Sequence, residues 1–163
     1  MGRETLDLTG HYVVPGLVDI HTHVYAGVTT WGIRADPACL RSGVTTIVDA
    51  GSPSWVTLPG FRWYIAEPAQ VRIYSFVHIS GIGLTYGPCG ESADLEYLDV
   101  DRCAQAVIEN PDLTTGVKVR QGGFQVGPHG VEPLRRAVAA AEQAKTRVMV
   151  YIGAGVPLLS VLE

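Results

Sequence analysis

The sequence predicts an α/β fold: an open parallel sheet of about five βα units, corresponding to a partial (β/α)8 TIM barrel. Apolar, β-branched runs recur along the chain, and segments with helical spacing lie between them. The runs are almost continuously apolar, as expected for strands covered on both faces. A closed barrel needs eight units and about 250 residues. This sequence of 163 residues is therefore expected to form an incomplete barrel.

The predicted elements alternate in order. Strands are expected over residues 13–20, 44–50, 71–79, 116–120 and 148–152. Helices are expected over residues 36–41, 55–67, 101–110 and 131–144, with a last one beginning near Pro157. Pro59 is expected to interrupt the second helix. In the helix over 131–144, one apolar face is predicted from the spacing of Val131, Leu134, Val138 and Ala141.

Two long glycine-rich loops follow the third and fourth predicted strands. They span residues 81–91 and 121–130. Both leave the carboxyl ends of strands, which is the side on which α/β proteins build their binding sites. We therefore expect the functional residues at this edge of the sheet.

Composition and charge narrow the class of protein. The formal net charge is −4 and no basic cluster is present, which argues against nucleic acid or an acidic membrane as a partner. No apolar run approaches the ~20 residues of a membrane helix. The three cysteines are scattered, which favours a reducing compartment and argues against disulfides or a thiolate zinc site. No apolar leader follows Met1, so a cytoplasmic protein is expected.

His21 and His23 are the main candidates for metal ligands. Side chains at i and i+2 of a strand point to the same face, so both imidazoles emerge together at the end of the first strand. Two neutral imidazoles suit zinc, at roughly 2.0–2.1 Å each. The alternative is a pair of ordinary surface or core histidines. The preceding Pro15-Gly16 turn and Asp19 favour metal binding.

Several stretches carry a family resemblance. Residues 14–23, VPGLVDIHTH, resemble the signature that opens the barrel in the amidohydrolase superfamily, which includes dihydroorotases, hydantoinases, ureases and deacetylases. Residues 42–51 resemble the second strand of that superfamily. The segments similar to a dihydroorotase-like deacetylase branch are 116–120, 130–134 and 148–153. The resemblance implies an incomplete amidohydrolase barrel over 13–163, preceded by a remnant of a β-sandwich over 1–12.

The resemblance also implies a set of zinc ligands. His21 and His23 would hold the first metal, and Lys118 would be N-carboxylated and bridge two divalent ions. A desolvated lysine can lose its proton and add carbon dioxide. The metal would then provide a hydroxide that attacks a carbonyl carbon. The alternative for Lys118 is an exposed lysine on an edge strand.

Arg120 lies two residues beyond Lys118 on the same strand face. We expect it to bind a substrate carboxylate through two parallel hydrogen bonds. A surface salt bridge is the alternative. His78 is interpreted as a hydrogen-bonded core histidine, His129 as a turn or cap residue, and the tryptophans as packing residues.

The sequence departs from the family pattern in its second half. The fifth strand carries Tyr151 where the resemblance implies a histidine, and a phenol is a poorer ligand than an imidazole. The sixth-strand histidine and the eighth-strand aspartate have no counterpart, so no catalytic residue is assigned. We therefore expect a mononuclear or weak metal site.

Three functions remain open from the sequence. The first is a zinc-dependent amidohydrolase acting on an amide, cyclic amide or acyl bond of a small molecule. The second is an inactive truncated fragment, or one half of a split barrel, that binds only metal or a complementing chain. The third is a plain α/β domain with an incidental His-x-His pair. The unpaired edges of an open sheet also leave a homo-oligomer as an alternative.

Overall fold

The computed structural model describes residues 4–153, which form a single five-stranded parallel sheet in the order β1-β2-β3-β4-β5. The strands are β1 Leu17–Thr22, β2 Val44–Asp49, β3 Arg72–His78, β4 Thr114–Arg120 and β5 Arg147–Tyr151. Every strand pairs with its sequence neighbour, as strands do in a (β/α)8 barrel. The sheet is curled into a half-barrel, which confirms the predicted partial barrel.

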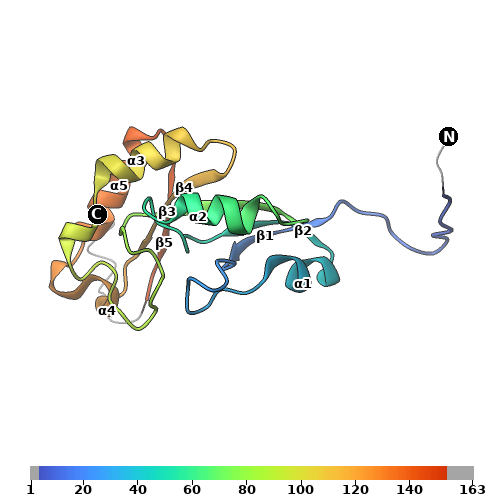
Figure 1. The fold of residues 1–163 in the computed structure, drawn as a ribbon, viewed down its shortest axis with the longest axis horizontal. Coiled ribbons are helices and arrows are strands. Elements are labelled where there is room, and N and C mark those ends of the chain that lie inside the picture. Colours follow the sequence, from blue (N-terminus) through green and yellow to red (C-terminus); the bar gives the residue numbers. More distant parts are fainter. Residues whose placement is uncertain (1–3, 154–163) are drawn as a thin grey trace.

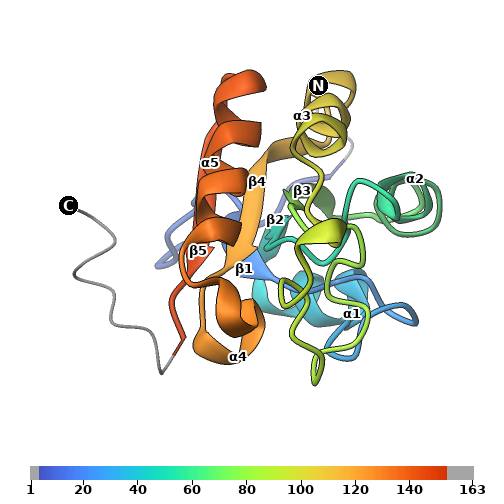
Figure 2. The same ribbon diagram turned by 90° about the vertical axis from the view of Figure 1, so that its left-hand side faces the viewer.

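A helix follows each of the first four strands. These helices are α1 Ala35–Cys39, α2 Leu58–Phe61, α3 Val100–Glu109 and α5 Glu132–Gln143. In Figure 2 they are spread in an arc around the sheet. A 3₁₀ turn extends α1 (η1, Leu40–Ser42), and a wider π-helical turn extends α2 (η2, Arg62–Ala66). Three further short elements were not predicted. α4 Gly123–Val126 and η4 Gly127–His129 lie within the second glycine-rich loop, and η3 Leu95–Tyr97 follows the first.

Pro59 begins a helix rather than interrupting one. α2 starts at Leu58, so Pro59 lies in its first turn. A proline is tolerated there because the first N–H groups of a helix have no partner within it. The predicted interruption was therefore wrong. The helix α3 confirms the helix predicted over 101–110, and the Asp99 side chain caps its start by accepting a hydrogen bond from the N–H of Arg102.

The buried face of α5 agrees with the predicted one in part, since Ala141 is buried and Leu134 packs against the core. Its buried residues are Pro133, Ala137, Ala140 and Ala141. Val138, which was predicted to lie on the core face, is 39% exposed. The helix packs against α3 and β4 through small alanines, which allow close approach of the backbones. The prediction followed the largest side chains and was wrong for Val138.

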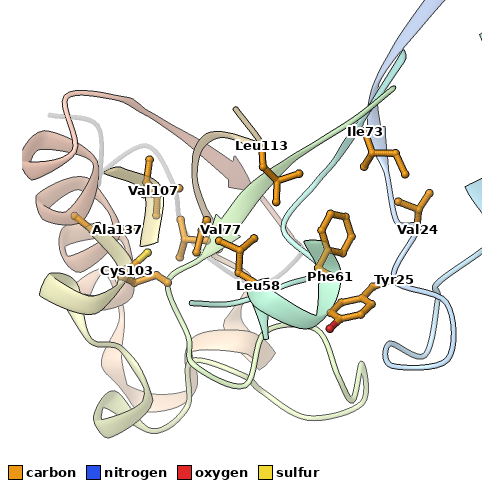
Figure 3. Close-up of a cluster of buried hydrophobic side chains, with 14 of the residues drawn as sticks. Val24, Tyr25, Leu58, Phe61, Ile73, Val77, Cys103, Val107, Leu113 and Ala137 are labelled. Atoms are coloured by element: carbon orange, nitrogen blue, oxygen red, sulfur yellow. The ribbon is translucent and has the colours of Figure 1, made fainter. Parts of the chain in front are cut away.

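The core lies between the sheet and the helices (Figure 3). Phe61 of α2 is fully buried and packs edge-to-face on Tyr25, with 5.1 Å between ring centroids. Val77 of β3 and Cys103 of α3 continue the cluster on the side of α5. Burying a side chain the size of Phe61 contributes roughly 1.5–3 kcal/mol.

The N-terminal segment forms no strand in its described part. Residues 4–16 run away from the sheet in Figure 1, and Tyr12 is 98% exposed. The assignment of residues 1–12 to a β-sandwich remnant therefore stays a prediction. The helix expected near Pro157 lies outside the described residues. Between residues 4 and 153, no helix is long and apolar enough to cross a membrane.

Candidate metal centre

His21 and His23 lie together at the carboxyl end of β1, as predicted. Their rings meet nearly at right angles, with 5.7 Å between centroids. Asp19 accepts a hydrogen bond from the backbone N–H of His21 at 3.0 Å. The strand ends at Thr22, and the chain then turns so that His21 stays exposed while His23 is half-buried.

His23 is held as a neutral imidazole. Its Nδ1 lies 2.9 Å from Oγ of Ser52, in the loop after β2. Burial lowers the pKa of His23 to about 4, and the nearby positive charges of His21, Lys118 and Arg120 lower it further in the same direction. A metal ligand must carry a free lone pair, so this protonation state is the one that metal binding needs.

Asp49 ends β2 and is fully buried. Its carboxylate accepts the N–H of Val24 at 2.7 Å and the N–H of Ser52 at 2.6 Å. Burial raises the pKa of Asp49 to about 6, although these hydrogen bonds act in the opposite direction. Neither Asp49 nor Ser52 was singled out from the sequence. The only signal was an acidic residue at the end of an apolar strand, directly before Gly51 and Ser52.

Lys118 lies in the middle of β4 and is 1% exposed. It pairs in register with His78 on β3 and Met149 on β5, so the alternative of an exposed lysine on an edge strand was wrong. Burial lowers its pKa to about 8, and the charge of Arg120 acts in the same direction. A Cβ at Gly51 would overlap Cβ and Cγ of Lys118, so the lysine stem crosses the end of β2.

Arg120 is paired with Glu91, a residue that the sequence analysis missed. Its Nε and Nη2 donate to the two carboxylate oxygens at 2.6 and 2.7 Å. The guanidinium lies over the rings of Trp31, at 5.1 Å, and Tyr151, at 5.9 Å. Two of its donors are therefore already used. The role of Arg120 in binding a substrate carboxylate stays a prediction.

Glu91 is 1% exposed and also faces His78. Burial alone would raise the pKa of Glu91, but the hydrogen bonds from Arg120 and the adjacent His78 ring outweigh it and lower the pKa to about 2. Nδ1 of His78 accepts the N–H of Ser80 at 3.1 Å, which leaves a proton on Nε2, 3.5 Å from Glu91. His78 is thus the buried, hydrogen-bonded histidine that the sequence predicted. With Nε2 protonated, it offers no lone pair to a metal.

Other residues noted in the sequence lie around this edge. Tyr151 is the register partner of Arg120 and is 42% exposed. His129 lies 2.9 Å from the carbonyl oxygen of Ala93, in keeping with a turn residue. Trp31 is not a buried packing residue, because its half-exposed ring lies 6.2 Å from the ring of His23.

The residues present fit part of a zinc site. Throughout the described chain, no three His, Cys, Asp or Glu side chains gather closely enough to hold a metal ion. Two imidazoles on one rigid strand end are nevertheless suitable zinc donors, and one of them is held neutral. The third candidate, Lys118, binds metal only if its amine loses its proton or is converted to a carboxylate. Its burial favours loss of the proton, which gives the neutral amine that can react with carbon dioxide.

Comparisons with known proteins identify relatives of this chain. No protein-family profile matches the chain. The chain is 36% identical over 153 residues to a deacetylase of Agrobacterium fabrum, covering 92% of this chain and 37% of that protein. A deacetylase of Enterococcus faecalis is 30% identical over 159 residues, covering 96% and 42%. The chain thus spans less than half the length of these relatives.

Solved structures give the same result. The crystal structure of a dihydroorotase superposes with a TM-score of 0.78 and 35% identity, over 88% of this chain and 45% of that one. The crystal structure of an adenine deaminase gives a TM-score of 0.84 and 28% identity, over 91% and 40%. The fold, the order of the motifs and these relatives agree. The chain belongs to the amidohydrolase superfamily and corresponds to part of its barrel.

Proposed function

We propose that this chain carries the metal-binding part of a zinc-dependent amidohydrolase that cleaves an amide, cyclic amide or acyl bond of a small molecule. The observations that carry the proposal are the His21–His23 pair at the carboxyl end of β1 and the buried Lys118 of β4, whose charge acts on the pKa of His23. The relatives named deacetylase and the dihydroorotase structure support a hydrolase of this kind.

The residues have separate roles in this proposal. His21 and His23 would hold a zinc ion, and Lys118, as a carbamate, would add a further oxygen ligand. A metal held there would polarise a carbonyl group and lower the pKa of water. Arg120, held by Glu91 and enclosed by Trp31 and Tyr151, would contact the polar part of the substrate through its remaining N–H groups.

A non-catalytic role is the second candidate, and Tyr151 favours it. The phenol lies on the fifth strand, where the family resemblance implies a histidine, and its ring packs against Arg120. In the described sheet, β1 and β5 each have one unpaired edge. A chain of this shape would bind metal with two or three ligands and pair with a complementing chain or a second copy.

A cytoplasmic location and the absence of a nucleic-acid partner both stay predictions.

Zinc content and cobalt titration would test the proposal. The purified chain should contain stoichiometric zinc, and the double variant His21→Ala/His23→Ala should contain none. Co²⁺ should quench the fluorescence of Trp31, whose ring lies beside His23. The matched control is His11→Ala/His129→Ala, which removes two imidazoles elsewhere and should behave like the parent chain.

Activity separates the two candidate functions. Turnover of simple N-acyl or cyclic-amide compounds by the zinc-loaded chain, lost in the double variant, would support the hydrolase. Metal binding without turnover would support the non-catalytic role. A parent chain with no more metal than the double variant would overturn both.

A further inference from the structure

Trp31 lies beside the candidate metal centre, and three separate segments of the chain approach its ring. The centroid of the indole lies 6.2 Å from that of the His23 ring. The guanidinium of Arg120, at the end of β4, lies over the indole at 5.1 Å from its centroid. Gly87, in the loop after β3, packs directly against it. The position of this ring is therefore set by residues that are far apart in sequence.

The contact between Gly87 and Trp31 leaves no room for a side chain at position 87. A Cβ there would overlap Cζ2 of the indole. The φ angle of Gly87 is not positive, so this glycine provides space rather than an unusual backbone conformation. The N–H of Gly87 donates to Oγ1 of Thr30 at 3.2 Å, which joins the two loops next to the ring. The loop after β3 therefore holds the indole on one side.

Trp31 differs from the other exposed tryptophan of the chain. Trp63 is 58% exposed, and its ring lies against that of its sequence neighbour Tyr64. A single exposed side chain of that kind is ordinary on a protein surface. Trp31 is 43% exposed although its ring is held between Arg120 and Gly87. A ring that is already fixed but still partly open can bind a flat group without first losing side-chain freedom.

We propose that Trp31 contacts the substrate and selects an aromatic or other flat conjugated group next to the bond that is cleaved. The proposal rests on the function proposed above and names its substrate class. The group lies next to that bond because the indole lies beside His23. Aromatic rings pair favourably with centroids about 4.5–7 Å apart, which gives such a substrate an advantage over an aliphatic one. Gly87 is the positioning residue of the ring.

The first test compares the binding of acetanilide and N-methylacetamide to the purified chain, followed by the NMR signal of the Trp31 indole N–H. Both probes carry the same acetamide group, and only acetanilide carries a phenyl ring. Acetanilide should bind about 10-fold more tightly and shift the Trp31 signal. Trp31→Ala should abolish this preference, Trp31→Phe should keep most of it, and the matched control Trp63→Ala should leave it unchanged. The proposal is overturned if the parent chain does not prefer acetanilide, or if the preference survives in Trp31→Ala.

The second test displaces the ring without removing it. In Gly87→Ala the new methyl group overlaps the indole, so Trp31 must move. Acetanilide affinity should fall by up to about 10-fold, whereas the affinity for N-methylacetamide should stay at the parent value. In a Trp31→Ala background, Gly87→Ala should have no further effect on either probe. An equal loss of acetanilide affinity in both backgrounds would show that the variant disturbs the loop rather than the ring, and would overturn the positioning role of Gly87.

The substrate preference and the proposed function fail in different ways, because amide binding and zinc content are measured separately. A parent chain that prefers acetanilide through Trp31 but contains no zinc would overturn the proposed function and leave Trp31 as a binding residue. A parent chain that binds zinc through His21 and His23 but binds the two amides equally would overturn the role of Trp31 and leave the function intact.

Discussion

Polar and charged side chains are buried at the carboxyl end of the sheet and exposed to solvent at its amino end. At the carboxyl end, Lys118, His78, Glu91 and Asp49 are all nearly or fully buried. At the amino end, a hollow of about 550 Å³ is lined by Arg62, Arg72, Asp112 and neighbouring residues, and it opens to solvent. The Arg62–Asp112 ion pair there leaves the Asp112 side chain 67% exposed.

The comparison shows that the volume of a hollow and the burial of charged groups point to different ends of the sheet. The hollow at the amino end is large, but its charged side chains are solvated, so their ion pairs contribute little to stability. Burying charges at the carboxyl end is unfavourable unless each has a partner, so such groups are expected where function requires them. We therefore assign the functional edge by its buried charges rather than by cavity volume. Four predictions test this assignment.

The largest effect is expected from Glu91→Ala. It would leave Arg120, and the Nε2 proton of His78, without their buried partner. Removal of one member of a buried pair destabilises a protein by about 3–5 kcal/mol. Denaturant unfolding followed by circular dichroism would measure the change. A loss near zero would mean that Arg120 is solvated in solution, and the buried character of this edge would be refuted.

The stability of the chain should also depend on Glu91 at acid pH. The hydrogen bonds from Arg120, together with the adjacent His78 ring, hold its folded pKa at about 2, below the ordinary value of 4.5, in spite of burial. Because the folded pKa is depressed, this contribution is complete above about pH 4.5 and is lost as pH falls towards 2. The shift corresponds to about 3 kcal/mol.

Comparison with Glu91→Gln isolates that contribution. The variant has no titrating group at this position, and Lys118, whose pKa is about 8, stays protonated in both proteins below pH 4.5. The difference in unfolding free energy between parent and variant should narrow between pH 4.5 and pH 2. Parallel pH profiles for the two proteins would contradict the depressed pKa.

A smaller effect of opposite sign is expected from Lys118→Met. The change keeps the approximate volume of the buried stem and removes a charge that no ion pair offsets in the described structure. Replacing buried charges by well-packed apolar groups often stabilises proteins by about 1–4 kcal/mol. The variant should be more stable than the parent and should lose any dependence of zinc binding on bicarbonate. Destabilisation would show that the Lys118 amine makes bonds that hold the sheet together.

Only part of the carboxyl end of the sheet could be predicted from the sequence. Strand periodicity located the five strands, and the same periodicity placed His21 with His23 and Lys118 with Arg120. Glu91 could not be predicted, because it belongs to a long glycine-rich loop whose path is set by contacts far apart in sequence. Val138 was misplaced because the packing distance between α5 and α3 depends on alanines, which carry little weight in an apolar pattern.

The smallest effect is expected from Asp112→Ala at the opposite end of the sheet. The carboxylate accepts two hydrogen bonds from Arg62, at 2.8 Å each, yet it remains exposed to solvent. Arg62 also keeps a hydrogen bond to Asn110 after the change. The bonds that Asp112 loses are replaced by water, so the unfolding free energy should stay within experimental error of the parent. A loss comparable to that of Glu91→Ala, persisting in high salt, would mean that exposure does not distinguish the two ion pairs. Buried charge would then be no guide to which end of the sheet carries the function.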